Sequence, residues 1–325
     1  MPYSTKSMKD CAKIVTIIAP FLDEKENLPM LYDRIVAVMK DRPEAWELIL
    51  VDDGSSDGST EWVREKAHAD PRVRLIQLAR DFGHQVAITA GLDNAKHDVA
   101  IVMDADLQDP PELIPELLDK WHEGNDVVYA VRARRDGESF LKKATAALFY
   151  RFFHRLTRIH MPLDSGDFRL LDRKVVEALG QMRERHRFIR AMTSWTGFRQ
   201  ASVSYDRAAR HSGKSKYEAY HLIKLALDGL VSFSGEPLRL FVKLGFFFAM
   251  LGVIYLACIV VNWALGLGYY PRGWVTLAGL ILLMGGIQLC GIGVVGQYIS
   301  RIFEETKKRP LYFIADDTGP AVPGR

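Results

Sequence analysis

Two long uncharged segments near the C-terminus are the feature that most restricts how this chain can fold. The first runs from Leu244 to Pro271 and the second from Gly273 to Ser300, and neither contains Asp, Glu, Lys or Arg. A helix needs about 20 apolar residues to cross the hydrocarbon core of a bilayer, and each segment exceeds that length. Two buried core helices are the alternative interpretation, but a soluble core rarely contains two such segments in succession. The sequence therefore predicts a C-terminal hairpin of two transmembrane helices, over about residues 241–265 and 274–299.

The charges beside these segments predict which way the hairpin is oriented. Arg239 and Lys243 precede the first segment, and Arg301 and Lys307 follow the second, whereas the connecting turn carries only Arg272. Short loops rich in Lys and Arg stay on the cytoplasmic side of a membrane. We therefore expect a multi-pass protein of the inner (cytoplasmic) membrane, with residues 1–235 and the tail of residues 303–325 in the cytoplasm.

The composition of the whole chain fits a globular protein and argues against nucleic acid as a partner. Of its 325 residues, 48% are hydrophobic and 26% are charged, and the formal net charge is only +3. A chain of this length accommodates one α/β domain and a smaller second part, and a nucleic-acid-binding domain is usually much more basic. Cys11, Cys258 and Cys290 are far apart and form no Cys-x-x-Cys pair, so neither a zinc site nor a disulfide framework is predicted.

Short apolar runs alternate with amphipathic segments through the first part of the chain. The runs are short and mostly β-branched, as expected of buried parallel strands, and lie at residues 14–19, 48–51, 73–78, 99–103 and 127–131. The segments with helical spacing lie between them, at residues 27–40, 59–68, 85–95 and 112–123. We expect Ser59 to cap the second of these helices and Asp109 to begin the fourth. Such alternation predicts an α/β sheet that binds its ligands at the carboxyl ends of the strands.

Acidic pairs follow two of the predicted strands. Asp52 and Asp53 come directly after the second strand, and Asp104 and Asp106 follow the fourth. Four carboxylates in one crevice would repel each other, and a divalent cation that bridges to a pyrophosphate would neutralise them. Mg²⁺ and Mn²⁺ favour oxygen-rich sites of this kind. Asp57 is better interpreted as a turn or cap residue, and no G-x-G-x-x-G follows the first strand, which disfavours a nicotinamide or flavin enzyme.

Three motifs, taken with the hairpin, resemble one enzyme family. The motifs are Asp52-Asp-Gly-Ser-Ser-Asp57, Asp104-Ala-Asp-Leu-Gln-Asp-Pro-Pro111 and Arg210-His-Ser-Gly-Lys-Ser-Lys-Tyr217. They resemble the family 2 glycosyltransferases of GT-A fold, in particular the polyprenyl-phosphate branch that includes dolichol-phosphate mannose synthases and bactoprenol glucosyltransferases. The resemblance runs from Ile14 to about Pro310. It implies a GT-A, Rossmann-like nucleotide-sugar domain over residues 1–235, a transmembrane hairpin within residues 236–302 and a tail from residue 303.

The resemblance also implies the reaction. A hexose or related sugar passes from a nucleotide-diphosphate sugar, with UDP favoured and GDP possible, to an undecaprenyl or dolichyl phosphate. A lipid phosphate is already an anionic nucleophile, so catalysis needs mainly positioning and electrostatic stabilisation. Attack from the face opposite the leaving group inverts the anomeric configuration.

Donor and metal sites follow from the family pattern residue by residue. Pro20, Glu24 and Asp53 are implied to contact the base and ribose, with Asp52 in the same donor-binding group, and Arg132 is implied to face phosphate. The resemblance further implies that Asp106 and Gln108 hold a Mg²⁺ or Mn²⁺ ion that bridges the diphosphate.

Catalytic and acceptor residues follow from the same pattern. Asp104 and Asp167 are implied to lie near the anomeric carbon, and which of the two acts in catalysis is left open. Arg210, Ser215 and Lys216 are implied to close over the donor and the lipid phosphate, with Arg210 also in a catalytic role.

Some of these positions also have a purely structural interpretation, or depart from the family pattern. Ser215 with Glu218 three residues later forms a capping box, so Ser215 could simply begin a helix. His84 is more readily interpreted as a packed or capping residue than as a catalyst. Asp23 and Asp81 stand where the family usually has Asn, which replaces an amide donor by a group that only accepts.

Two basic amphipathic segments, at residues 139–156 and 216–233, predict helices that lie on the membrane surface. A core-packed helix with a solvated basic face is the alternative for the first of them. These helices would hold the active site at the level of the lipid headgroups, where the acceptor phosphate must stay.

Two other functions fit the sequence less well. A processive polysaccharide synthase of the same superfamily requires a Q-x-x-R-W motif and more membrane helices, and the chain has neither. A non-catalytic scaffold or flippase component would leave the acidic pairs unexplained, and two helices cannot form a transport path alone. A homo-oligomer could form one, and the sequence is compatible with a homo-oligomer.

Overall fold

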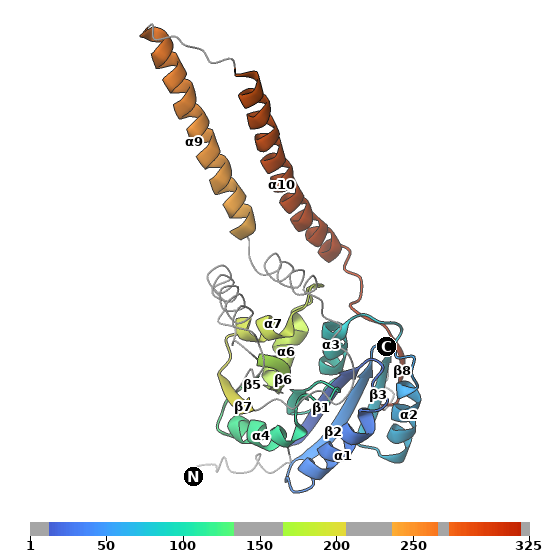
Figure 1. Ribbon diagram of the computed structural model, residues 1–325. Coiled ribbons are helices and arrows are strands. Elements are labelled where there is room, and N and C mark those ends of the chain that lie inside the picture. The colour runs from blue at the N-terminus through green and yellow to red at the C-terminus, as the bar shows by residue number, and fades with distance from the viewer. Residues whose placement is uncertain (1–12, 133–164, 206–235, 266–272, 320–325) are drawn as a thin grey trace, which may run out of the picture. The chain divides into compact units, whose positions relative to one another are not determined.

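The computed structural model describes residues 13–132, 165–205, 236–265 and 273–319. The chain divides into two compact units (Figure 1). The first comprises residues 1–154, 159–216 and 309–325, and the second comprises residues 155–158 and 217–308.

A twisted sheet forms the centre of the first unit. Its strands within the described residues follow the spatial order β7-β5-β6-β4-β1-β2-β3-β8. They are β1 (Ile14–Phe21), β2 (Ala45–Asp52), β3 (Val73–Leu78), β4 (Val99–Val102), β5 (Val127–Arg132), β6 (Ser165–Asp172), β7 (Gln200–Tyr205) and β8 (Ile314–Asp317). β1 pairs in parallel with β2 and β4, whereas β6 pairs antiparallel with β4 and β5, and β8 pairs antiparallel with β3. The result is a mixed α/β fold with a Rossmann-like sheet.

Helices cover both faces of this sheet (Figure 1). One face packs against α1 (Leu28–Met39), α2 (Ser59–Ala69) and α4 (Ile114–His122), the last of which continues a 3₁₀ turn over Pro111–Leu113. The other face packs against α3 (His84–Asn94), α6 (Arg173–Gln181) and α7 (Ile189–Trp195). Successive side chains of a strand point to opposite faces. Neighbouring Ile17 and Ile18 of β1 are therefore both fully buried, in two separate apolar layers.

The five strands predicted from the sequence are confirmed as β1 to β5, and the four predicted helices as α1 to α4. The predicted cap of α2 is wrong: Gly58, at φ 90°, is the N-cap residue, and Ser59 is the first residue of the helix, with its amide donating to Asp57 Oδ1. The predicted start of the fourth helix is confirmed to within two residues, since its opening 3₁₀ turn begins at Pro111; the N-cap residue is Pro110, and Asp109 instead accepts a hydrogen bond from the Tyr205 hydroxyl at 2.8 Å.

The end of the chain forms the edge strand β8, where the sequence predicted only a tail. Arg309 to Asp317 return to the first unit, and β8 pairs with β3 through Ile76 and Asp317. A strand of four residues that ends in two aspartates has little β propensity of its own. Arginines of the neighbouring elements stabilise it instead, because Arg74 and Arg64 bind the two aspartates.

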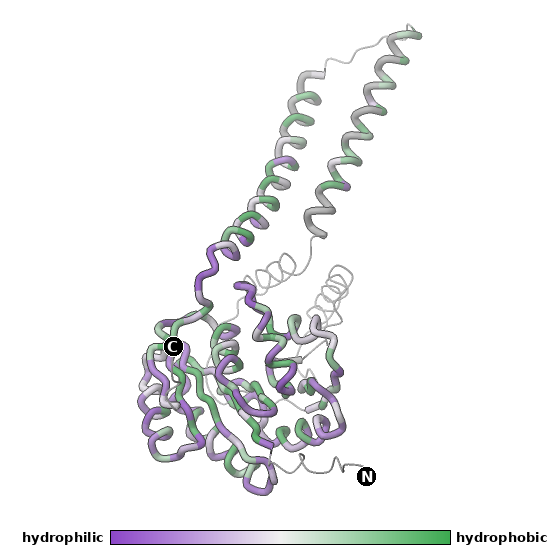
Figure 2. The backbone as a smooth tube through the Cα atoms, turned by 180° about the vertical axis from the view of Figure 1, so that it is seen from behind, coloured by the Kyte–Doolittle hydropathy of each residue, from purple (hydrophilic) through white to green (hydrophobic). Residues whose placement is uncertain are grey.

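The second unit contains two long helices, α9 (Glu236–Ala264) and α10 (Trp274–Thr306), which contact each other. They overlap the two ranges in which the sequence predicted membrane helices, and hydrophobic residues recur along both (Figure 2). By the combined measure of length and apolar character, none of the helices in the described part of the chain qualifies as a membrane span. The predicted membrane crossing therefore stays a prediction.

Candidate active site

The carboxyl ends of the parallel strands β1, β2 and β4 lie along the same end of the sheet. The chain runs from β1 to β2 on one side and reaches β4 on the other side of β1, so the strand order reverses between β1 and β4. β1 lies between β2 and β4, with Phe21 opposite Asp52 and Ile18 opposite Val102. Chain segments leave such a switch point in opposite directions and open a crevice, which is where α/β sheets bind ligands. The predicted acidic motifs follow β2 and β4, so both lie at this edge.

Asp52 holds the loop after β2 in shape. Its side chain is fully buried, and Oδ1 accepts hydrogen bonds from the amides of Gly54 and Ser55 at 3.2 and 2.8 Å. Oδ2 accepts a hydrogen bond from Thr60 Oγ1 at 2.6 Å. Gly54 has φ +94°, and a Cβ atom there would lie 2.9 Å from the amide nitrogen of Asp81, so only glycine fits. Both oxygens of Asp52 therefore serve the loop, and its predicted contact with the donor stays a prediction.

Asp53 points the other way, toward the loop before α3. Its Oδ1 accepts a hydrogen bond from the Phe82 amide at 2.8 Å and its Oδ2 accepts one from the Gly83 amide at 3.0 Å. The same Gly83 amide donates to Asp81 Oδ1 at 2.9 Å, so two carboxylates share one donor. Burial raises the pKa of Asp53 to about 6; the amide hydrogen bonds oppose this rise and the charge of Asp81 adds to it. An Asn at position 81 would have lacked that charge.

The loop after β1 packs onto the loop after β2. Pro20 is buried within β1. Asp23, in the left-handed region at φ 57°, accepts a hydrogen bond from the Ser56 amide at 2.7 Å. The Glu24 amide donates to Ser59 Oγ at 3.1 Å. Asp57 accepts hydrogen bonds from the amides of Lys25 and Ser59, at 3.0 and 2.9 Å, which confirms its predicted structural role in the turn before α2.

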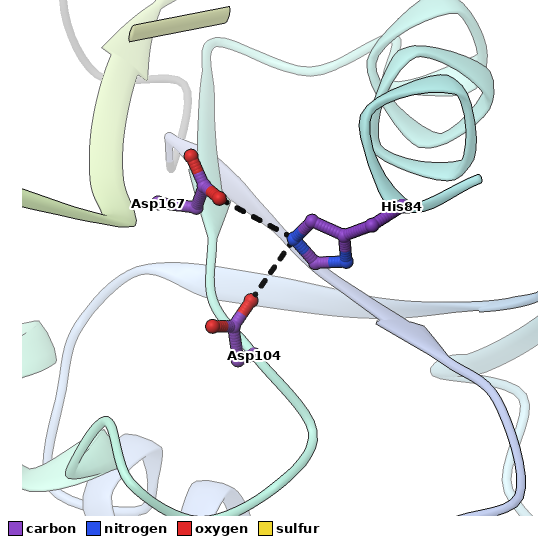
Figure 3. A group of neighbouring side chains, drawn as sticks. All are labelled: His84, Asp104 and Asp167. Carbon is purple, nitrogen blue, oxygen red and sulfur yellow. Dashed lines mark ion pairs between the residues drawn. The ribbon is translucent and has the colours of Figure 1, made fainter. Parts of the chain in front are cut away.

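His84 joins the two candidate catalytic carboxylates (Figure 3). Its Nε2 lies 3.3 Å from Asp104 Oδ1 and 3.4 Å from Asp167 Oδ2. The three residues come from three elements, since His84 begins α3, Asp104 follows β4 and Asp167 lies in β6. Burial lowers the pKa of His84, but the two carboxylates outweigh that effect and raise it to about 10. The raised pKa favours the charged form of the ring, which lies between the two carboxylates, a contact that the sequence did not predict.

Asp167 has further partners besides His84. Arg190 donates from Nε to Oδ1 at 2.8 Å and from Nη2 to Oδ2 at 3.0 Å. Gln85 Nε2 donates to Oδ2 at 3.2 Å, and Gln85 Oε1 accepts a hydrogen bond from the Ile189 amide at 3.0 Å. Burial alone would raise the pKa of Asp167, but Arg190 and His84 hold it well below its usual range. Sequence reasoning missed Arg190, which lies in a basic stretch with no motif of its own.

The loop after β4 offers oxygen ligands for a metal ion. Asp106 is half-buried and its Oδ1 accepts a hydrogen bond from the Gln108 amide at 3.1 Å across Leu107, which has φ 61°. Beside it, Asp104 Oδ1 faces His84, and a third of the Asp104 side chain is exposed. Carboxylate and amide oxygens are the ligands that Mg²⁺ and Mn²⁺ prefer, and Asp106 and Gln108 supply one of each. The residues present therefore fit the implied ion.

His84, Asp104 and Asp167 also place ligand atoms within 4.8 Å of one another, as a metal site would. A metal there would have to displace the Arg190 fork from Asp167 and a proton from His84. Both carboxylates already face a cation in this arrangement, so we interpret the group as an ion-pair network.

The other predicted site residues are not described in side-chain detail. Arg132 ends β5, and its side chain lies outside what the structure describes. Arg210, Ser215 and Lys216 lie outside the described residues, as do both predicted membrane-surface helices.

Comparison with known proteins decides the family. The model for glycosyl transferase family 2 matches residues 16–180, and the model for the GtrB C-terminal hairpin matches residues 236–302. The chain belongs to glycosyl transferase family 2. This glycosyltransferase is 45% identical to an uncharacterized glycosyltransferase of Bacillus subtilis, over 94% of each chain. It is 38% identical to the bactoprenol glucosyl transferase of Shigella phage SfV, over 93% of this chain and 98% of that one.

Among solved structures, it is similar to glucosyl-3-phosphoglycerate synthase from Mycobacterium tuberculosis in complex with Mn²⁺, UDP and phosphoglyceric acid. The sequences are 17% identical, and the TM-score is 0.49 over 69% of this chain and 79% of that one.

Proposed function

We propose that this glycosyltransferase moves a hexose or related sugar from a nucleotide-diphosphate sugar to a polyisoprenyl phosphate, with inversion, and yields a lipid monophosphosugar. The observation that carries the proposal is the coexistence of two features in one chain. Acidic residues follow the carboxyl ends of β2 and β4, the two strands that flank β1, and a C-terminal hairpin matches the one named for GtrB. Relatives named bactoprenol glucosyl transferase are similar to this chain over nearly their whole length.

The donor binds, in this proposal, across the edge of the sheet. The loops of Asp23, Asp53 and Asp81 offer acceptors to the hydroxyl and N–H groups of a nucleoside. The diphosphate lies toward the loop after β4, where Asp106 and Gln108 would hold Mg²⁺ or Mn²⁺. When bound, the ion neutralises the charge of the departing nucleoside diphosphate.

Asp104 lies closest to the reacting sugar in this arrangement. A third of its side chain is exposed, so its carboxylate can stabilise positive charge that develops on the sugar, or orient the acceptor. The acceptor phosphate supplies its own negative charge, so no base has to remove a proton from it. Arg210, Ser215 and Lys216 are proposed to bind that phosphate.

Product analysis tests the reaction. The purified full-length protein is incubated with undecaprenyl phosphate and a panel of UDP- and GDP-sugars, and lipid and nucleotide products are identified by mass. We expect a lipid monophosphosugar and a nucleoside diphosphate in equal amounts. Stoichiometric nucleoside monophosphate with a lipid diphosphosugar would show phosphoglycosyl transfer instead, and would refute the proposal.

We further propose that the hairpin anchors the enzyme in the inner (cytoplasmic) membrane with the catalytic unit in the cytoplasm. The uncharged segments and the flanking basic residues support this arrangement. A cysteine introduced at Gly268 should react with an impermeant reagent from outside, and one at Asp316 only after the membrane is opened. Reaction of both positions from the same side would exclude a membrane-crossing hairpin.

A further inference from the structure

Asp104 and Asp167 face the same histidine but differ sharply in what else surrounds them. Only 6% of the Asp167 side chain is exposed, against 33% of the Asp104 side chain. Asp167 receives the Arg190 fork and the Gln85 amide in addition to His84. For Asp104, His84 is the one charged partner that the described residues provide, at Oδ1.

These surroundings limit what each carboxylate can do. A carboxylate oxygen can bind a substrate only through a lone pair that no protein donor already occupies. Oδ1 of Asp167 accepts from Arg190, Oδ2 faces Arg190, Gln85 and His84, and only 6% of the side chain is exposed, so little of this carboxylate is open to a substrate. Asp104 Oδ1 is buried against His84, which leaves Oδ2 as the oxygen available to a substrate.

We propose that Asp167 is a positioning residue, which Arg190 and Gln85 fix so that it holds His84 against Asp104, the carboxylate that meets the donor sugar. The proposal rests on the proposed function and decides which of the two aspartates touches the reacting atoms. Arg190 and Gln85 have no contact with a reacting group in this arrangement. They act through Asp167, and Asp167 acts through His84.

The chain of contacts also explains why α7 begins where it does. Gln85 accepts a hydrogen bond from the Ile189 amide, at the start of α7, while its amide nitrogen donates to Asp167. The N-terminus of α7 is thereby fixed to the N-terminus of α3, and Arg190 is presented to Asp167 in one orientation. Supporting contacts of this kind typically change activity by about 10–100-fold when they are removed.

A double-mutant cycle tests the assignment. The full-length protein is prepared as Asp167→Asn, His84→Gln and the double variant, and kcat and KM for the nucleotide-sugar are measured with undecaprenyl phosphate. If Asp167 acts only through His84, each single variant should lose roughly tenfold or more in kcat with KM for the donor nearly unchanged. The double variant should be no slower than the slower single variant. Asp104→Asn should lose at least about 100-fold in the wild-type background, since it removes the group that meets the substrate.

Arg190 provides a second, independent cycle. Arg190→Gln combined with Asp167→Asn should again show losses that do not multiply, and Arg190→Lys should recover only part of the kcat, because lysine keeps the charge but not the fork. Arg183→Gln is the matched control: it removes an Arg–Asp pair of 2.7 Å, with Asp93, that lies outside this network, and should leave kcat unchanged. Thermal melting of every variant shows whether it is folded. If Arg190→Gln does not fold, Arg190→Lys replaces it in the cycle with Asp167→Asn.

The outcomes separate two kinds of failure. Losses that multiply in both cycles, in an active enzyme, would mean that Asp167 contacts the reacting atoms itself and would overturn the positioning role while leaving the function intact. The same cycles are also measured without lipid, as hydrolysis of the nucleotide-sugar to sugar and nucleoside diphosphate. The result then does not depend on having chosen the right acceptor. A wild-type protein that turns over no nucleotide-sugar overturns the proposed function.

Discussion

Asp317, near the C-terminus, forms an ion pair with Arg74 whose loss should destabilise the catalytic unit measurably. Asp317 Oδ1 and Oδ2 accept hydrogen bonds from Arg74 Nε and Nη2, both at 2.8 Å. Only 7% of the Arg74 side chain is exposed, and 28% of the Asp317 side chain. The pair joins edge strand β8 to β3, so its strength decides how firmly the end of the chain is held in the sheet.

The burial of the two side chains sets the magnitude of the effect. Asp317→Asn keeps the shape of the side chain but leaves the Arg74 cation buried beside a neutral partner. Removing one partner of a fully buried ion pair costs ~3–5 kcal/mol, and an exposed pair is worth ~0–1 kcal/mol. Because Asp317 is partly exposed, we expect a loss of about 2 kcal/mol in the free energy of unfolding. For a unit of this size that corresponds to a fall of roughly 4–8 °C in Tm.

The neighbouring Asp316 is the matched control. It pairs with Arg64 at 3.1 Å, but the two side chains are 45% and 36% exposed. Asp316→Asn should therefore cost less than about 1 kcal/mol, on the same strand and with the same chemical change. Melting curves and urea unfolding of the two variants provide the comparison. Equal losses in the two variants, or none in either, would refute the argument from burial.

The pH dependence of Asp317→Asn gives a second check. Burial raises the pKa of Asp317, but Arg74 outweighs burial and the net pKa is lowered from the ordinary value of 3.8. A lowered folded pKa stabilises the protein above the unfolded pKa, and that stabilisation is lost as the pH falls through the folded value. The difference between wild type and Asp317→Asn should therefore be largest at neutral pH and shrink below pH 3.8.

Three further predictions concern the site and its supports. Gly91→Ala should cost about 1–3 kcal/mol in stability, since its Cβ would lie 2.3 Å from Ile18 Cγ2 on β1, whereas the control Gly180→Ala meets nothing within 4 Å and should be neutral or slightly stabilising by urea unfolding. The raised pKa of Asp53 disfavours its ionised form in the folded state, so the wild-type protein should lose stability as the pH rises toward 6. Asp81→Asn removes a neighbouring charge that raises this pKa, so the loss should be smaller in the variant, as urea titrations across that pH range would show. Chelation should abolish sugar transfer, Mg²⁺ or Mn²⁺ should restore it, and Asp106→Asn should lower kcat roughly 100-fold with an unchanged melting curve, as a continuous assay of nucleoside diphosphate would show.

The part of the fold that the sequence revealed is the part with strong local signals. Strands β1 to β5 are apolar runs, and helices α1 to α4 have helical spacing and recognisable turns between them. Strand β6 escaped prediction because it interleaves polar residues with apolar ones, as in Ser165-Gly-Asp-Phe-Arg169, and its two faces become clear only when Phe168 is seen in one core layer. Strand β8 escaped because long-range ion pairs, not propensity, stabilise it.

The site was predictable to the extent that residues follow the carboxyl ends of consecutive strands. That rule brought Asp53 and Asp104 to one edge of the sheet, where the structure has them. It could not bring in Arg190 or Gln85, because their contacts depend on how α7 packs against α3, which no local pattern encodes. The sequence predicted His84 to be a packed or capping residue. Its role depends on two carboxylates that are 20 and 83 positions away in the chain.

The position of β8 constrains the hairpin in a way that the sequence alone did not. The chain leaves the catalytic unit before α9 and is again part of the same sheet at Ile314. Both ends of the hairpin are therefore tied covalently to one folded unit, and a sheet cannot form across a bilayer. Any membrane crossings by α9 and α10 must consequently be even in number, whichever charges flank them. This argument uses connectivity and strand pairing, whereas the positive-inside rule uses sequence; an even number of crossings, which includes none, is compatible with the proposed hairpin but does not fix its orientation.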